Sequence, residues 1–277
     1  WYILAISDYI KQTGDWAILD NQQPFIDAPA APLIEHLHAV VRFVRGNLGS
    51  HGLPIFGRGD WNDTLDYIGG DDGGESVWGA MFYVAMLNHL IELLTHLGLA
   101  GPLATAVETR DQLKEAVQNH CWDGEWYIRA FGARERRIGS RTNTAGRIFL
   151  NTQSWAVIAE IDASGRLEQA MESVWNHLNT PYGPKKCAPA FREIDPTIGL
   201  VTRCVAGKKE NGAIFAHPTA WVIMAECLLG HGDRAFTYYK EMLPNAIDSD
   251  IFVAEPYVFS QYVTSDEHSA PGRASHS

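Results

Sequence analysis

The sequence predicts an all-α fold in which helical hairpins stack and close into a toroid, with minor short β-hairpins. Apolar residues recur at helical spacing through most of the chain, and Gly and Pro stand in the gaps between these segments. The segments also alternate between wholly apolar and amphipathic, which is typical of buried inner helices surrounded by exposed outer ones. No exact repeat of about 20–50 residues is present, so the common helical solenoids are unsupported.

The helices are expected in the following order. Residues 2–12 form a short helix, and residues 30–48 form an amphipathic one. Residues 75–98 form a long helix that has no charged residue between Val77 and Leu87. We expect this stretch to be buried on nearly all sides, and the polar residues that follow it argue against a membrane span. The remaining helices are predicted at residues 103–119, 151–162, 166–178, 215–230 and 233–243.

Strand signals are few. Residues 126–131 alternate in polarity and follow the turn Asp123-Gly124, so we expect a short hairpin there. Two segments, 50–74 and 180–213, have little regular pattern. They are long for connections within a compact domain, and such loops are usually functional.

Composition and charge exclude several classes of protein. The 277 residues carry a formal net charge of −11, which disfavours a nucleic-acid partner and means that any anionic ligand needs a local cluster of cations. No charged segment or cleavage site precedes the first apolar helix, so we expect no signal peptide. The four cysteines form no C-x-x-C pair, so zinc and redox sites are unsupported, and free thiols indicate a cytoplasmic protein.

The first candidate site is the run Gly59-Asp60-Trp61-Asn62-Asp63 in the first long loop. An exposed indole between two acids suits a sugar, because the flat ring packs on the sugar face and an acid acts on the glycosidic bond. A calcium loop is one alternative, but Leu65 stands where such a loop needs Gly. A solvated, capped turn is another. Asn62-Asp63-Thr64 is a formal glycosylation sequon, and a glycan there would block this site, which also favours the cytoplasm.

Two further runs carry chemistry. Lys208-Lys209-Glu210-Asn211-Gly212 is followed by His217, and its cations and carboxylate can hold sugar hydroxyls. The same residues ahead of an apolar segment also fit an ordinary helix start. The third run, residues 255–262, is rich in aromatic residues and by itself more often belongs to a core than to a site.

In this order, the runs resemble family 94 of the glycoside hydrolases, which contains inverting cellobiose, chitobiose and cellobionic acid phosphorylases. Each run is weak alone, but together they are specific and span essentially the whole chain. The matching runs are His51-Gly52-Leu53-Pro54, residues 59–63, Gly74-Glu75-Ser76-Val77-Trp78, Trp122-Asp123-Gly124-Glu125-Trp126-Tyr127, Phe149-Leu150-Asn151-Thr152-Gln153-Ser154-Trp155, Leu178-Asn179-Thr180-Pro181-Tyr182-Gly183, Lys209-Glu210-Asn211-Gly212, His217 and Glu255-Pro256-Tyr257-Val258.

The resemblance implies that residues 1–277 are a single (α/α)6 catalytic domain, incomplete at both ends, and that the family's N-terminal β-sandwich is absent. It also implies roles for particular side chains. Asp63 is the general acid, Trp61 lines the donor sugar site, and His217 contacts phosphate. Substrate-binding roles fall to Lys209 and Glu210, which hold donor hydroxyls, and to Gln261 in the matching later segment.

The implied reaction is a single displacement. The acid protonates the glycosidic oxygen while inorganic phosphate attacks the anomeric carbon from the other face, giving an α-sugar 1-phosphate. Because phosphate is already an anionic nucleophile, a second carboxylate is not needed. Inorganic phosphate is the co-substrate, and no metal or other cofactor is expected. Burial beside Trp61 or the nearby Asp60 should keep Asp63 protonated near neutrality.

The acceptor sugar remains open between a neutral sugar, as in cellobiose, and an anionic one, as in cellobionic acid. In the family, Thr often precedes the lysine of the Lys-Glu-Asn-Gly run, whereas here Lys208 precedes Lys209, and Arg203 lies just upstream. Additional cations suit an anionic acceptor such as gluconate. The alternative is that Lys208 only faces solvent.

Other functions are also open. An inverting (α/α)6 hydrolase would need a second carboxylate as base, for which Asp66 or Glu210 are candidates. A glycan-binding module would bind sugar without catalysis. In each case the expected partners are small molecules, a disaccharide and phosphate for the phosphorylase, with no nucleic acid and no membrane. A homodimer is an assembly that the sequence leaves open.

Overall fold

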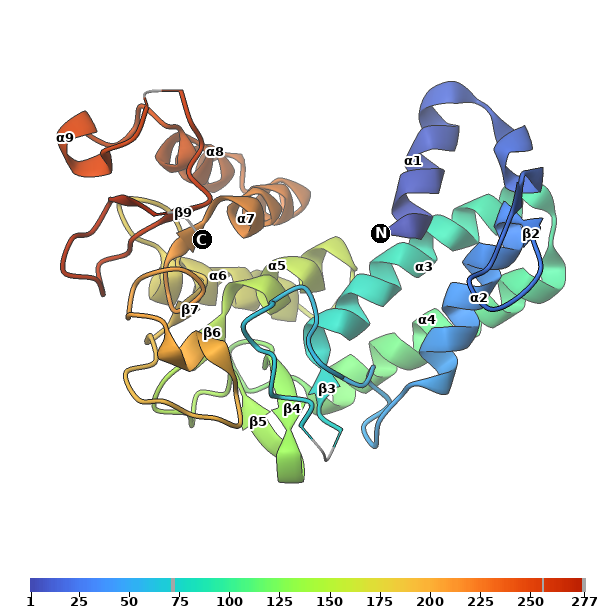
Figure 1. Cartoon of the computed structure of the whole chain (residues 1–277), viewed down its shortest axis with the longest axis horizontal. Coiled ribbons are helices and arrows are strands. Elements are labelled where there is room, and N and C mark those ends of the chain that lie inside the picture. The colour runs from blue at the N-terminus through green and yellow to red at the C-terminus, as the bar shows by residue number, and fades with distance from the viewer. Residues whose placement is uncertain (71–72, 256, 276–277) are drawn as a thin grey trace.

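The chain folds into an arc of paired helices (Figure 1). The computed structural model describes residues 1–70, 73–255 and 257–275. The α-helices are α1 Tyr2–Thr13, α2 Leu33–Gly46, α3 Val77–Leu97, α4 Ala100–His120, α5 Leu150–Ile158, α6 Arg166–Leu178, α7 Ala216–Leu228, α8 Gly232–Met242 and α9 Ser249–Phe252. Short 3-10 helices are η1 Trp16–Asp20, η2 Ala133–Glu135 and η3 Leu200–Arg203.

The helices form two layers. Helices α1, α3, α5 and α7 contact one another in that order, and α3, α5 and α7 each pack against the helix that follows, α4, α6 and α8. Every residue of α5 from Leu150 to Val157 is buried, whereas α6 is amphipathic and buries one stripe. This is the architecture of an (α/α) toroid. The predicted alternation of apolar and amphipathic helices is therefore confirmed.

The strands are short and hold the inner helices in place. They are β1 Gln22–Gln23, β2 Ala31–Pro32, β3 Glu75–Ser76, β4 Ala130–Gly132, β5 Arg136–Ile138, β6 Ile148–Phe149, β7 Cys187–Ala188, β8 Ile214–Phe215, β9 Tyr262–Val263 and β10 Ala274–Ser275. They pair antiparallel as β1-β2, β3-β4-β5, β6-β7 and β10-β9-β8. Strands β3, β6 and β8 run directly into α3, α5 and α7, so the first turns of the inner helices lie on the side where the strands gather (Figure 1).

Helix α3 is the buried core of the arc. The Ser76 hydroxyl caps it by accepting the Gly79 N–H at 2.8 Å, and Gly98 ends it in the left-handed conformation. From Val77 to Leu87 only Tyr83 is not fully buried, as predicted. The helix is long and apolar enough to cross a membrane, but 72% of its apolar window is buried inside this fold, as expected for a core helix.

The predicted helices are all present, and the largest boundary error is explained by the backbone. Residues 166–178 are helical as predicted, but the helix expected at 151–162 ends at Ile158. Glu160 adopts a positive φ of 51°, which an α-helix cannot contain. A single backbone angle of this kind leaves little signal in a pattern of apolar residues.

The hairpin predicted around residues 126–131 is only partly correct. Trp122 pairs with Tyr127 across the Asp123-Gly124 turn, but β4 begins only at Ala130. All six residues are buried, although their sequence alternates in polarity. Strand β4 is paired along both edges and packs against α3, and all three of its residues are buried.

The aromatic segment 255–262, which by itself is more typical of a core than of a site, is mostly exposed. Tyr257, Val258 and Phe259 are exposed, and Pro256 lies outside the described residues. Only from Tyr262 onward does the chain pair with β8 and β10. The chain is thus exposed at residues 257–259, buried at Ser260 and paired as a strand from Tyr262.

The first long loop closes on its own ends. The Phe56 N–H donates to the Gly74 carbonyl at 2.5 Å, and the Ser76 N–H donates to the Pro54 carbonyl at 2.8 Å. Between these contacts, a Cβ on Gly69 would overlap the backbone carbonyl of Gly57. The loop is irregular in pattern but tightly packed, and its close backbone approach requires glycine.

Replacing Gly69 with Ala should therefore lower the free energy of unfolding by about 1–3 kcal/mol, because the added methyl group forces two backbone segments apart. Urea or thermal unfolding measures the effect. Gly101→Ala is the matched control: its Cβ would meet nothing within 4 Å, and alanine favours the helix. Equal stability of the two variants would contradict the close packing of this loop.

Candidate active site

Three helix N-termini converge on residues 60–62. Ser76, the N-cap of α3, donates to Asp60 at 2.8 Å, and Asn151 in the first turn of α5 donates to Asn62 at 3.3 Å. His217 in the first turn of α7 lies edge-on to Trp61, with ring centroids 5.1 Å apart. Because helix N-termini carry partial positive charge, this place favours anionic groups.

Asp60 is held by a buried arginine. Arg129 Nη2 donates to both carboxylate oxygens of Asp60 at 2.6 Å and to Asn62 Oδ1 at 2.9 Å. The Arg129 side chain is 0% exposed and its guanidinium lies over the Phe56 ring. Breaking such a pair costs about 3–5 kcal/mol because it leaves one buried charge uncompensated. Asp60 is therefore occupied by a structural contact.

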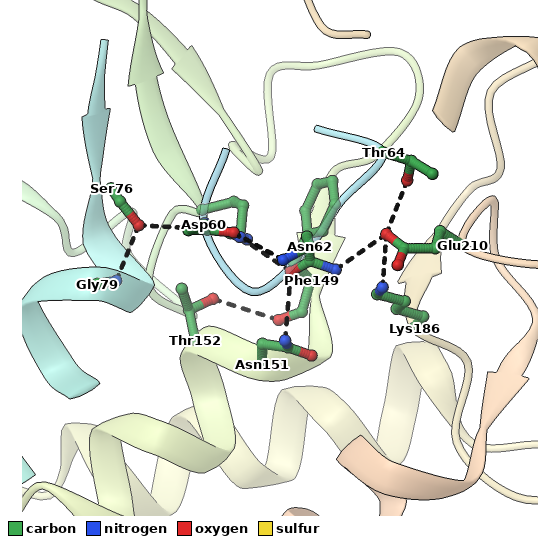
Figure 2. A network of polar contacts seen from close by, with 11 residues as sticks. Asp60, Asn62, Thr64, Ser76, Gly79, Phe149, Asn151, Thr152, Lys186 and Glu210 are labelled. Carbon is green, nitrogen blue, oxygen red and sulfur yellow. Dashed lines mark hydrogen bonds and ion pairs between the residues drawn. The ribbon is translucent and has the colours of Figure 1, made fainter. Parts of the chain in front are cut away.

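The Glu210 carboxylate is contacted by residues 62–64 and by Lys186 (Figure 2). Its Oε2 atom accepts hydrogen bonds from Thr64 Oγ1 at 2.7 Å and from Asn62 Nδ2 at 3.2 Å, and lies 2.7 Å from Lys186 Nζ. Burial alone would raise the pKa of Glu210, but the Lys186 ammonium and these donors outweigh it and hold the pKa below its usual value. The carboxylate is thus fixed and charged.

Trp61 lies in an aromatic cluster. Its ring stacks on Phe215 at 5.3 Å between centroids and meets Trp221 edge-on at 4.7 Å. The indole expected to be exposed is therefore half-buried. With Asp60 it lines a cavity of about 460 Å³, whose other walls include Trp1, Phe43, Trp78 and Phe82. A cavity with aromatic walls and one acidic edge suits a sugar ring.

Asp63 differs from its neighbours. Asn62 and Thr64 on either side are bound to Glu210, whereas Asp63 is exposed and has no side-chain partner within the described residues. The burial predicted for Asp63 is wrong, because its neighbours, and not Asp63, turn toward the interior. Asp60 also does not act on it as a free charge, since Arg129 compensates Asp60.

The other predicted site residues lie around the start of α7. The Gln261 carbonyl accepts the Ala216 N–H at 3.0 Å, which places Gln261 beside His217, and both side chains are exposed. His217 is still partly covered by its neighbours, and this partial desolvation lowers its pKa. Lys209 is half-buried with a φ of 51°, in a turn beside Glu210. The helix-start alternative is wrong for this run, because α7 begins only at Ala216.

The two cations proposed for an anionic acceptor lie outside the Glu210 contacts. Arg203 is exposed at the end of η3 and lines a cavity of about 670 Å³ together with Arg192 and His268. Lys208 is half-buried, and its backbone pairs with Asn211. In the 1–70, 73–255 and 257–275 ranges, no group of three His, Cys, Asp or Glu side chains is arranged to hold a metal ion.

Asp66, one candidate for a second catalytic carboxylate, is also occupied. Its Oδ1 accepts the Leu200 N–H at 2.8 Å and so fastens the first long loop to η3. A Cβ on Gly199 would overlap the same oxygen, and Gly199 has a φ of 125°, so this contact requires glycine. Glu210, the other candidate, is ion-paired with Lys186.

Two residues of the site were missed from the sequence, Arg129 and Lys186. Both are buried, and their partners lie elsewhere in the chain: Arg129 and Asn62 are 67 residues apart. For Arg129 the available signal was a basic residue inside an otherwise apolar run, whereas Lys186 follows another lysine and gave no such signal. Buried cations need a partner, so such a residue indicates a buried ion pair.

This chain is similar in sequence to known proteins. The model of the Glycosyl hydrolase 94 superfamily, catalytic domain, matches residues 1–277. The solabiose phosphorylase of Paenibacillus borealis is 38% identical over 94% of this chain and 34% of its own length. The N,N'-diacetylchitobiose phosphorylase of Vibrio proteolyticus is 36% identical over 100% of this chain and 34% of its own length. The 3-O-beta-D-glucopyranosyl-beta-D-glucuronide phosphorylase of Paenibacillus borealis is 32% identical over 90% of this chain and 32% of its own length.

The fold is shared more widely. A family GH78 rhamnosidase of Bacillus sp. GL1 is similar in structure, with a TM-score of 0.62 and 16% identity over 99% of this chain and 24% of that one. The chain spans about a third of the length of the curated relatives that it matches. The family match covers every residue, and two of these relatives exceed a third identity over nearly the whole chain. The chain belongs to the glycosyl hydrolase 94 superfamily and forms part of its catalytic domain.

Proposed function

We propose that this chain carries the general acid of a glycoside phosphorylase, which cleaves a β-linked disaccharide with inorganic phosphate and inversion. The supporting observation is that one carboxylate of the cluster is unengaged within the described residues. Asp60 is paired with Arg129, Asp66 with the Leu200 N–H, and Glu210 with Lys186, which leaves Asp63. A reaction that needs one acid and an external anionic nucleophile fits this set.

In the proposed mechanism, the donor sugar ring packs against the Trp61 side of the cluster, and Glu210 and Lys209 bind its hydroxyls, with Gln261 nearby. Asp63 gives its proton to the glycosidic oxygen as the bond breaks. Phosphate attacks the anomeric carbon from the opposite face, and the product is an α-sugar 1-phosphate. The phosphate brings its own negative charge, so no carboxylate has to activate the nucleophile.

Phosphate binding is assigned to the N-terminal turn of α7. His217 lies there beside Trp61, and the helix terminus favours an anion. The net charge of −11 makes such a local positive place necessary. Phosphate is the co-substrate in this proposal, and no further cofactor takes part.

The hydrolase alternative is less well supported. It would need Asp66 or Glu210 as a base that activates water, but Asp66 is turned to the backbone of η3 and Glu210 is neutralised by Lys186. A sugar-binding module without catalysis would use Trp61 and Glu210 equally well. Phosphate dependence of cleavage distinguishes the phosphorylase from the hydrolase. Loss of turnover on removal of Asp63 distinguishes an enzyme from the binding module.

For the acceptor we propose an anionic sugar such as gluconate, as in cellobionic acid, with cellobiose as the neutral counterpart. Arg203 and Arg192 line one cavity on an otherwise acidic chain, and Lys208 follows closely in sequence. The name of one relative includes a glucuronide, an acidic sugar. Two other relatives are named for solabiose and diacetylchitobiose, so the cations of this chain, not the family, support the choice.

We also propose a cytoplasmic location, with a homodimer as the assembly to test. The cysteines Cys121, Cys187, Cys204 and Cys227 are unpaired. Asn62, the acceptor of the formal glycosylation sequon, is 1% exposed and bound to Glu210. A glycan attached there would have to break the network of the site.

Replacing Asp63 with Asn should lower kcat for phosphorolysis by about 10²–10⁴-fold and leave KM for the disaccharide nearly unchanged, because the amide cannot donate a proton to the leaving oxygen. Release of sugar 1-phosphate from cellobiose, chitobiose and cellobionate by the full-length protein measures it. Asp66→Asn is the matched control, with the same loss of charge three residues away and a retained acceptor for the Leu200 N–H. A full rate in Asp63→Asn would refute the role of Asp63, and cleavage without phosphate would favour the hydrolase.

Replacing Lys208 with Thr should reduce synthesis from sugar 1-phosphate and gluconate by roughly tenfold, since a charged hydrogen bond contributes about 1.5–3 kcal/mol. Synthesis with glucose should change little. The two acceptors are compared by kcat/KM in the same protein preparation, which cancels differences in folding. An equal loss with both acceptors would rule out a selective contact between Lys208 and the carboxylate.

A further inference from the structure

Lys186 is a buried cation at the centre of the site. Its backbone is fixed on both sides, because its N–H donates to the Ala213 carbonyl at 2.8 Å and its carbonyl accepts the Leu150 N–H at 2.9 Å. The side chain is 2% exposed. Its position is thus set by the segments that lead into α5 and α7, and its long side chain has little freedom to move.

The ammonium of Lys186 meets one carboxylate and two aromatic rings. Nζ lies 2.7 Å from Glu210 Oε2 and 5.1 Å from the ring centroids of both Trp61 and Phe215. Cation–π contacts of this kind strengthen when water is excluded. The same cation therefore contacts two residues assigned to the donor sugar site, Glu210 and Trp61.

The neighbouring lysine has different contacts. Lys185 Nζ lies 3.2 Å from Asp266 and 3.6 Å from Glu267, and neither carboxylate contacts the Glu210 network. The two lysines are adjacent and carry the same charge, but they bind different carboxylates. They form a natural pair for comparison.

We propose that Lys186 is a positioning residue, which holds the Glu210 carboxylate charged and in one orientation so that its Oε1 atom can accept a hydroxyl of the donor sugar. The proposal rests on the donor-binding role proposed for Glu210. The contacts from Lys186, Thr64 and Asn62 all fall on Oε2, and the Tyr262 side chain is also hydrogen-bonded to this carboxylate. Lys186, Thr64 and Asn62 thus hold one oxygen of Glu210, and Oε1 is the oxygen that they do not contact.

The charge balance explains why a cation is needed. A carboxylate buried in apolar surroundings takes up a proton unless an opposite charge compensates it. Thr64 and Asn62 are neutral, so they orient Glu210 but supply no full charge. Burial lowers the pKa of Lys186 and Glu210 opposes this, whereas the pKa of Glu210 stays below its usual value. The other titratable groups whose charge or hydrogen bonding is coupled to that of Glu210 are Tyr262 on β9, Cys187 on β7 and Cys204 after η3.

Loss of Lys186 should therefore change the site in a pH-dependent way. Without the ammonium, the pKa of Glu210 rises, so Glu210 is protonated at low pH and regains its charge as pH rises. A protonated carboxyl group is a weaker acceptor for a sugar hydroxyl. The defect should be largest at acidic pH and should partly recover at alkaline pH.

The test compares kcat/KM for phosphorolysis from pH 6 to 8 in the full-length protein and four variants: Lys186→Met, Lys185→Met, Glu210→Gln and the double variant Lys186→Met/Glu210→Gln. Each value is divided by the wild-type value at the same pH, which cancels the pH dependence that the two proteins share. For Lys186→Met this ratio should fall at least about tenfold between pH 8 and pH 6. For Lys185→Met and for the double variant it should not depend on pH.

The outcomes separate this proposal from the proposed function. A wild-type protein that shows no phosphate-dependent cleavage contradicts the phosphorylase itself. An active wild type with a pH-independent ratio for Lys186→Met, or the same pH-dependent ratio for Lys185→Met, overturns only the role of Lys186. Should Lys186→Met fail to fold, the double variant, in which both buried charges are removed, supplies the test: its kcat/KM should equal that of Glu210→Gln within about threefold, and a further large loss would overturn the proposal.

Discussion

The structure of the site depends on the pairing of charges that are buried together. Asp60 binds Arg129, Arg129 also binds Asn62, Asn62 binds Glu210, and Glu210 binds Lys186. Isolated buried charges are costly, so each member requires the next one in place. Ordering two long irregular loops costs conformational entropy, and this connected set of contacts offsets it where regular hydrogen bonding cannot. The loops have one conformation because the charges have one way of pairing.

The toroid supplies the frame for this network. Two-residue strands lead into the inner helices, and each strand pairs with a segment from elsewhere in the chain, which fixes where each helix begins. The first turns of α3, α5 and α7 then each contact residues 60–62. Aligned helix dipoles place partial positive charge there. The fold therefore favours negative groups at this locus before any ligand is present, which matters on a chain of net charge −11.

Much of the fold could be predicted from the sequence, because burial of an apolar face leaves a periodic trace in the pattern of residues. The helices, the buried stretch of α3 and the two long loops are where they were expected. Helix ends were less accurate, since the end of α5 depends on the backbone angle of Glu160. The residues of the site likewise differ in how well the sequence predicts them. Asp63, Trp61 and Glu210 stand in recognisable runs, but Lys186 and Arg129 do not. Their roles come from partners such as Asn62, brought close only by the fold.

Asp60 and Asp63 show how environment assigns chemistry. They are the same residue type in one loop, and residue type alone does not rank them; in the sequence only the family resemblance singles out Asp63. Asp60 meets a buried guanidinium and the N-cap of α3, so its negative charge is stabilised and its oxygens are occupied. Asp63 stands between two residues that are drawn inward to Glu210, and its carboxyl group is left exposed. A group that donates a proton to a substrate must be reachable and must not be engaged in an ion pair. Only the second acid meets both conditions, so the ion pair that makes Asp60 structural is also what leaves Asp63 available for chemistry.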